Sequence, residues 1–306
     1  MTTRVANLAQ YQRNITYILD TESRLNTAQI QLSSGQKSTT YSGIASDVRR
    51  LVNVQDSYVQ SKQYTSSNNL VDQRLQITES SVSQIFDVLT SYKTLLVNGL
   101  NASNSADLAM PTQAQSMLNE VASLLNVQDD GRYLFSGSRT DTPPVDQSGL
   151  PVAYTIPSAS GYAIGYYKGD NTQLSVQADV NFTVNYGINA NEPGFEEAIR
   201  ALHEVIIGTP NDKTTMEDAL GIVTQALNDV SDIRTKIGAA RSALQNVNSR
   251  LDQYQLYSEK TISDLQNVDI TETITRMNQD QTAIQASFMT LSRLSQLTPK
   301  TSGVPA

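Results

Sequence analysis

Residues 31–47, QLSSGQKSTTYSGIASD, contain side chains that could bind phosphate. A P-loop holds a nucleotide with backbone amides and a lysine, and it needs a glycine directly before that lysine and another glycine five positions earlier. Here Gln36 separates Gly35 from Lys37, and Ile30 stands five positions before Gly35. The spacing therefore predicts a connector between two elements and disfavours a nucleotide site.

An acidic pair and a single histidine are the other candidates for chemistry. Two neighbouring carboxylates such as Asp129 and Asp130 could bind a cation or act in acid–base catalysis, but Asp-Asp-Gly is also a turn signal, which we favour. His203 lies in the helical segment ALHEVI, and the chain has no cysteine or second histidine to complete a metal site with it. We therefore predict no catalytic residue, no cofactor and no metal ion.

The composition points away from a thick globular core. The chain has 306 residues, 39% of them hydrophobic, with no Trp and five Phe. Such a composition favours long helices with narrow apolar stripes.

The net charge of −8 disfavours nucleic acid and anionic membrane surfaces as partners. No apolar run is long enough for membrane insertion, and the N-terminal residues do not read as a cleaved secretory signal.

Hydrophobic periodicity predicts the helices that would position these residues. Residues 1–34 and 44–98 lack Gly and Pro and carry apolar side chains at alternating three- and four-residue steps, so we expect two long helices that end near Gly35 and Gly99. A third helix should begin at Pro111 and reach about Gln128. Helix returns near Pro193, where Glu196 and Glu197 suit a helix N-terminus. It continues through Leu265, and a last helical stripe runs from Ile270 to Leu294.

Residues 131–194 have a different pattern. They hold many of the 15 Gly, nine Pro and 14 Tyr residues of the chain, and they alternate turn signals with short β-forming runs such as YAIGYY and TQLSVQADV. The predicted fold is therefore mainly α with an inserted β domain. The helices would form a long antiparallel bundle or coiled-coil rod, with the two termini together at one end.

The narrow apolar seams near the two ends of the chain are the strongest signal. Each seam offers little apolar surface, and the two seams lie at opposite ends of the sequence. We therefore expect the two terminal segments to become ordered on association with other molecules. We predict that the following residues pack between subunits: Leu8, Ile15, Ile18, Leu25, Leu32, Ile274, Met277, Ile284, Phe288 and Leu291.

Two motifs point to a known family. RLNTAQIQLSSGQKS resembles the N-terminal signature of bacterial flagellins, in which a helix with a leucine seam ends in L-S-S-G-x-[KR]. DDGRYLFSGSRTDTPPV, residues 129–145, resembles a segment of the hook–filament junction proteins of this family. The filament flagellins usually carry DDAAG soon after the glycine loop, where this chain has YSGIASDVRR.

The resemblance implies a structural protein that joins hook to filament by helical self-assembly. It implies a terminal coiled-coil polymerisation domain (1–43 with 266–306), a helical rod domain (44–130 with 195–265) and an outward-facing β-rich domain (131–194). It also implies export without a cleaved signal peptide to the extracellular flagellum. The implied partners are further copies of the chain, a neighbouring junction or hook protein, flagellin and an export chaperone.

Three alternatives stay open on the sequence. A filament flagellin subunit would share the fold but polymerise indefinitely. A hydrolase would use Asp129 and Asp130, although the carboxylates of the chain lie mostly on predicted helical faces. A coiled-coil adaptor outside the flagellum would also suit a helical rod with a β tip.

Overall fold

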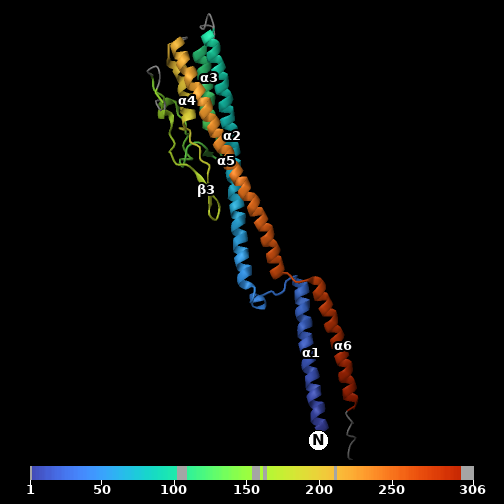
Figure 1. The fold of residues 1–306 in the computed structure, drawn as a ribbon. Coiled ribbons are helices and arrows are strands. Elements are labelled where there is room, and N and C mark those ends of the chain that lie inside the picture. The colour runs from blue at the N-terminus through green and yellow to red at the C-terminus, as the bar shows by residue number, and fades with distance from the viewer. Residues whose placement is uncertain (1, 102–108, 154–158, 161–163, 210–211, 298–306) are drawn as a thin grey trace, which may run out of the picture. The chain divides into compact units, whose positions relative to one another are not determined.

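The computed structural model describes residues 2–101, 109–153, 159–160, 164–209 and 212–297, without the side chains of residues 2–8 and 294–297. These residues form six α-helices and two small antiparallel hairpins (Figure 1). The helices are α1 (Thr2–Ser34), α2 (Val48–Asn101), α3 (Met110–Leu125), α4 (Pro193–Ile207), α5 (Lys213–Gln266) and α6 (Ile270–Leu297). The mainly helical fold predicted from the sequence is confirmed.

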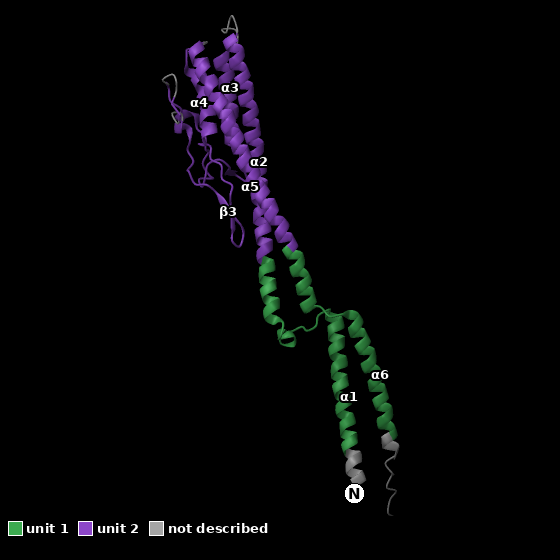
Figure 2. Ribbon diagram, viewed as in Figure 1, with its two compact units in different colours: residues 1–59, 254–306 green, residues 60–253 purple. Residues whose placement is uncertain are grey.

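The chain divides into two compact units (Figure 2). One unit consists of residues 1–59 and 254–306, and the other consists of the continuous segment 60–253. Both α2 and α5 contribute residues to each unit. None of the helices within the described ranges is long and apolar enough to cross a membrane.

The unit of residues 60–253 contains the main hydrophobic core. Parts of α2 and α5 lie beside α3 and α4 in a bundle (Figure 1), and their apolar faces are buried. Phe135 and Phe195 meet edge to face at the centre, with ring centroids 5.8 Å apart, and neither is exposed. The buried Tyr92 hydroxyl donates a hydrogen bond to the Ala201 carbonyl at 2.7 Å, so the polar end of this large side chain is satisfied.

The segment between α3 and α4 is held against this bundle. It contains β1 (Gln128–Asp129) paired with β2 (Arg132–Tyr133), and β3 (Ser175–Asp179) paired with β4 (Phe182–Asn185). The amide nitrogen of Asn68 on α2 donates to the Ala178 carbonyl at 3.0 Å and so attaches the second hairpin to the helices. Ala178 and Val184 of this hairpin are buried in the shared core.

Among its described residues, this inserted segment has less strand than the sequence suggests. TQLSVQADV and the residues after it form the β3–β4 hairpin, as expected. In YAIGYY, however, Ile164–Tyr166 is a 3-10 helix, because Tyr166 turns into the core and donates from its hydroxyl to the Ala190 carbonyl at 2.6 Å. Another short β-forming run expected from the sequence, VAYTI at residues 152–156, lies partly outside the described ranges, because residues 154–156 are not described. The three-domain division of the chain stays a prediction.

The unit of residues 1–59 and 254–306 is built on α1 and α6. The two helices lie side by side and run in opposite directions (Figure 1), and Arg24 of α1 pairs with Asp280 of α6 at 3.0 Å. The helix predicted to end at Gly35 does so, because Gly35 adopts a φ of +70° and its amide closes the last turn on Gln31. Gly99 instead lies inside α2, where it faces the sulfur atoms of Met110 and Met216.

Candidate assembly site on the terminal helices

The contact between α1 and α6 follows a heptad seam. On α1, Ile18, Thr21 and Ala28 are buried, and Leu25 and Leu32 between and beyond them are half-buried. On α6, Thr273 is buried, and the half-buried residues follow at three- and four-residue steps: Met277, Asp280, Ile284, Ser287 and Leu291. This spacing is that of an antiparallel coiled coil in which several core positions are polar. The pair therefore has a thin hydrophobic interface.

Three polar residues of the seam, Thr21, Thr273 and Asp280, have hydrogen-bond or ion-pair partners. Thr21 donates to the Tyr17 carbonyl at 2.7 Å and accepts a hydrogen bond from Arg24 at 3.1 Å. Asp280 is only 16% exposed and pairs with Arg24. Thr273 donates to the carbonyl of Asp269, the residue whose carboxylate caps α6 through the amide of Glu272. Polar positions of this kind fix the register of a coiled coil at some cost in stability.

The two connectors that lead into this helix pair are joined to each other. The Lys37 amide donates to the Gln266 carbonyl at 2.7 Å, and the Val268 amide donates to the Gly35 carbonyl at 3.0 Å. The Lys37 side chain donates to the carbonyl of Asp264, and Gln31 donates to the Lys37 carbonyl at 2.7 Å. We call this contact of residues 35–37 with residues 264–268 the connector clasp.

The connector clasp explains the residues that resembled a phosphate loop. The lysine amine binds a main-chain carbonyl of the same chain, and the segment before Gly35 is the helix α1 and not a strand. Residues 35–47, with a 3-10 turn at Tyr41–Ile44, link α1 to α2. The connector predicted from the spacing is therefore the one observed.

A second apolar face on the terminal helices has no covering segment among the described residues. On α1, Leu19 and Ile30 are 59% and 49% exposed, and the half-buried Ile15 lies on the same side of the helix. On α6, Ile274 and Phe288 are 39% and 50% exposed and share a helical face with Ile270. We call these residues the outer apolar faces of α1 and α6.

The residues predicted to pack between subunits thus fall into two groups. Six of them line the seam inside one chain: Ile18, Leu25, Leu32, Met277, Ile284 and Leu291. Ile15, Ile274 and Phe288 belong to the outer apolar faces, and the side chain of Leu8 lies outside the described part. Sequence reasoning missed Thr21, Ala28, Thr273 and Asp280, although their heptad spacing was visible.

The residues considered for enzyme chemistry have structural surroundings. Asp129 pairs with Arg74 at 3.2 Å, and Asp130 and Gly131 form the turn of the β1–β2 hairpin with φ values of +51° and +73°. His203 is half-buried on α4, where burial lowers its pKa. Across the described residues, no three His, Asp or Glu side chains gather as metal ligands do.

Sequence reasoning also missed a group of buried charges on α4. Glu196, Glu197, Arg200 and Glu204 are all buried, and Arg200 pairs with Glu196 at 3.1 Å. Burial and the neighbouring carboxylate of Asp218 on α5 raise the pKa of Glu204 to about 8. Burial and Asp229 raise the pKa of Glu197 to about 7. The only signal in the sequence was the acidic start of this helix, which also suits an exposed N-terminus.

These buried acids make the stability of the 60–253 unit fall as the pH rises from about 4 to about 8. An unfolded glutamate ionises near pH 4.3, whereas folded Glu204 keeps its proton to about pH 8, so the free energy of unfolding falls as the pH rises between these values. In Glu204→Gln, the drop in melting temperature from pH 5.5 to pH 9 should shrink by roughly 5–10 °C, because the interval from pH 5.5 to about pH 8 is two to three pKa units of linkage. Thermal unfolding followed by circular dichroism measures this difference.

The control for this experiment is Glu120→Gln, which makes the same substitution at an exposed position of α3. Its pH dependence should match that of the parent chain. If Glu204→Gln retained the parent's full pH dependence, the assignment of the raised pKa to Glu204 would be wrong. Asp170 and Asp212 do not confuse the result, because hydrogen bonds from Ser138 and Thr215 lower their pKa values and move their titration toward acid pH.

Comparison with known proteins identifies the family. The model of the bacterial flagellin N-terminal helical region matches residues 5–140, and the model of the C-terminal helical region matches residues 220–299. Together these regions cover more than half of the chain and include both helices of the seam. The chain belongs to the bacterial flagellin family.

Similar proteins within the flagellin family are hook-associated. The chain is 24% identical to flagellar hook-associated protein 3 of Escherichia coli over 93% of its own length and 95% of that protein. It is also 24% identical to flagellar hook-associated protein 3 of Salmonella typhimurium, over 94% and 95% of the two chains. A flagellin-family chain of this kind has a structural role in the flagellum.

Solved structures of flagellin-family proteins share the fold. A flagellar hook-associated protein of Vibrio parahaemolyticus is 20% identical and superposes with a TM-score of 0.61 over 74% of this chain and all of the other. FlgL of Bacillus cereus is 17% identical, with a TM-score of 0.55 over 70% of this chain and 99% of the other. The helical architecture with a small inserted hairpin region is therefore that of known members.

Proposed function

We propose that this chain is a junction protein that joins the hook of a bacterial flagellum to its filament by helical self-assembly. The similarity over almost the full length of two hook-associated proteins carries this proposal. The resemblance of residues 129–145 to a segment of hook–filament junction proteins also supports it. In the structure, Asp130 and Gly131 of this motif form a turn, and Phe135 enters the core. These residues of the motif thus serve the fold of the 60–253 unit, and function would reside in surfaces.

The outer apolar faces of α1 and α6 are the surfaces that we assign to assembly. A pair of helices whose seam is partly polar gains little stability alone, and exposed Leu19, Ile30 and Phe288 add apolar area that a neighbouring copy could bury. Contacts of this kind with further copies, with a neighbouring hook or junction protein and with flagellin would build the junction. An export chaperone would act earlier, and export outside the cell would need no cleaved signal.

A seeding assay tests the proposed function. Purified chain is added to isolated hooks, and the added length is followed by electron microscopy with and without ordinary flagellin. A junction protein should add a short zone that stops growing and then supports growth of flagellin. Hooks without the added chain are the control and should support less flagellin growth.

The same assay distinguishes the alternative function, a filament flagellin subunit. That alternative is supported by the matches to the two flagellin family models, at residues 5–140 and 220–299. Long tubes built from this chain alone would replace the junction proposal with the filament role. Failure of the chain to add to hooks at all would contradict both.

A further inference from the structure

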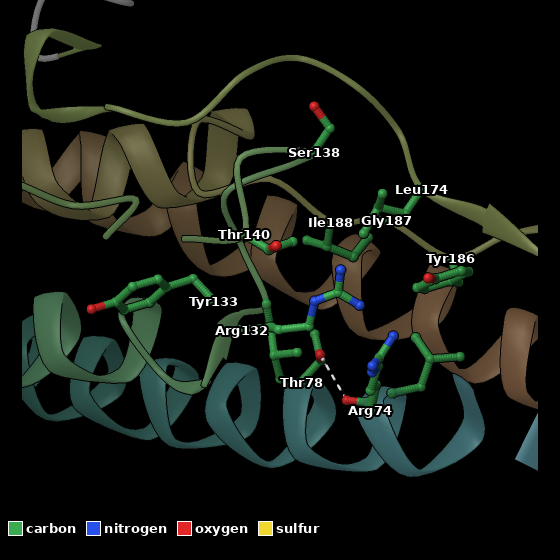
Figure 3. Close-up of a pocket in the computed structure, with 12 residues that line it drawn as sticks. Arg74, Thr78, Arg132, Tyr133, Ser138, Thr140, Leu174, Tyr186, Gly187 and Ile188 are labelled. Carbon is green, nitrogen blue, oxygen red and sulfur yellow. Dashed lines mark hydrogen bonds between the residues drawn. The ribbon is translucent and has the colours of Figure 1, made fainter. Parts of the chain in front are cut away.

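A small pocket in the 60–253 unit lies between α2, the β1–β2 hairpin and the chain on either side of the β3–β4 hairpin (Figure 3). Its volume is about 180 Å³, enough for a group of several non-hydrogen atoms. Leu75, Leu174 and Ile188 give it an apolar wall, and Thr140, Tyr186 and two arginines give it polar groups. Pockets with an apolar wall and a few convergent polar groups are typical of ligand sites.

The arginines leave a positive charge at this pocket. Figure 3 shows the side chains of Arg74 and Arg132 extending toward the segment of Tyr186, Gly187 and Ile188. Asp129 pairs with Arg74 at 3.2 Å, whereas Arg132 is exposed and pairs with no carboxylate in the described ranges. Of the two guanidinium groups at the pocket, only that of Arg74 therefore has a carboxylate partner among the described residues. The pocket thus has one guanidinium without a carboxylate partner in the described part of the chain, although the chain as a whole has a net charge of −8.

Nearby acids do not neutralise this charge. Asp72 and Glu79 on α2 both pair with Arg241 of α5. Asp170 is not among the residues that line the pocket, and it accepts hydrogen bonds from Ser138 and from the Thr172 amide. The Arg132 guanidinium is thus available to an anion from solution.

The pocket also contains hydroxyl groups that can donate hydrogen bonds, and backbone hydrogen bonds hold its walls in place. The hydroxyl groups of Thr140 and Tyr186 make no hydrogen bond among the described residues, so they can donate to a ligand. The Tyr133 amide donates to the Thr140 carbonyl at 2.9 Å, and the Tyr186 and Gly187 amides both donate to the Leu174 carbonyl. Because these bonds fix the walls before any ligand arrives, less conformational entropy is lost on binding.

We propose that this pocket binds a carboxylate group attached to an apolar body. Planar guanidinium groups recognise carboxylates through paired hydrogen bonds, and a single uncompensated positive charge matches a single negative one. The aliphatic wall of Leu75, Leu174 and Ile188 would take the apolar part of the ligand. The carboxylate comes either from a free small molecule or from an acidic side chain of a second copy of this chain.

Titration of the full-length chain with sodium benzoate at low salt tests the site. The probe combines one carboxylate with an apolar ring, and benzamide is the uncharged control of the same shape. With ¹³C-labelled methyl groups, the signals of Leu75, Leu174 and Ile188 should shift saturably with benzoate and stay unchanged with benzamide. Arg132→Gln should weaken benzoate binding at least about tenfold, because one charge-assisted contact is lost.

The matched control is Arg49→Gln, an exposed arginine of α2 outside the pocket, which should bind benzoate like the parent chain. Because Arg132 is exposed, its replacement should leave the melting temperature unchanged, and this is measured alongside. If raising the protein concentration alone reproduces the methyl shifts in the parent and not in Arg132→Gln, a second copy supplies the carboxylate. If only benzoate produces them, the ligand is a free molecule.

Three results would overturn the proposal. The first is the absence of any saturable shift at the three methyl-bearing residues. The second is an equal response to benzoate and benzamide, because the pocket would then not recognise charge. The third is unchanged benzoate affinity in Arg132→Gln. None of these results bears on the junction role, which the seeding assay tests separately.

Discussion

Phe288→Asp is expected to abolish addition of the chain to hooks while the α1–α6 pair stays formed. Phe288 is 50% exposed on the outer apolar face of α6, so the change leaves the seam within the chain intact. In an assembled wall, however, the new carboxylate would be buried without a partner, which costs several kcal/mol at each repeated contact. Electron microscopy of seeded hooks measures the loss of addition.

Gln279→Asp provides the control on the same helix. Gln279 is exposed and lies on a different side of α6 from Phe288, so this variant adds the same charge without touching the outer apolar face. It should assemble like the parent. Normal addition by Phe288→Asp would show that this face is not an assembly surface.

Ile18→Asp makes the complementary test. Ile18 is only 7% exposed and lies in the seam, so an aspartate there should separate α1 from α6 before any assembly begins. Hydrogen exchange of α1 measures that separation directly. The prediction for Phe288→Asp is that exchange in α1 stays at the parent rate although assembly is lost.

The largest effect on stability is expected from Phe195→Ala. Phe195 has no exposed surface and contacts the Phe135 ring edge to face at 5.8 Å. Removing the ring leaves a cavity at the centre of the 60–253 unit, and such a change typically costs about 3–5 kcal/mol. For a unit of this size the melting temperature should fall by roughly 10 °C, as measured by circular dichroism.

Phe182→Ala is the matched control for this prediction. It makes the same chemical change in β4, where the phenylalanine is 43% exposed, so its melting temperature should fall by much less. Equal losses in the two variants would contradict the central position of Phe195 in the core.

The helices were the most predictable part of this structure. Long runs without Gly or Pro that carry apolar residues at heptad spacing strongly favour helix. We expected α1, α2 and α6 on that basis. The end of α2 was misplaced because a glycine stops a helix only where packing allows it. Gly99 continues the helix, since its missing side chain makes room for Met110 and Met216.

The candidate site was less predictable than the fold. A heptad seam shows which side chains share a face, but it does not show whether the partner belongs to the same chain. The structure pairs Ile18 and Leu25 with α6, and the exposed residues beside this seam could be recognised only once that pairing was known. Arg74 and Arg132 are far apart in the sequence, so no local pattern could indicate their common pocket.

The division of the chain into a continuous and a discontinuous unit sets an order of folding. Residues 60–253 form a single stretch, so they can fold as soon as that stretch is available. The connector clasp and the α1–α6 seam instead join segments more than two hundred residues apart, as Arg24 and Asp280 show, and they must wait for the last helix. We therefore expect refolding from denaturant in two phases. The core of residues 60–253 should regain protection from exchange first, and α1 should follow only after α6 has formed.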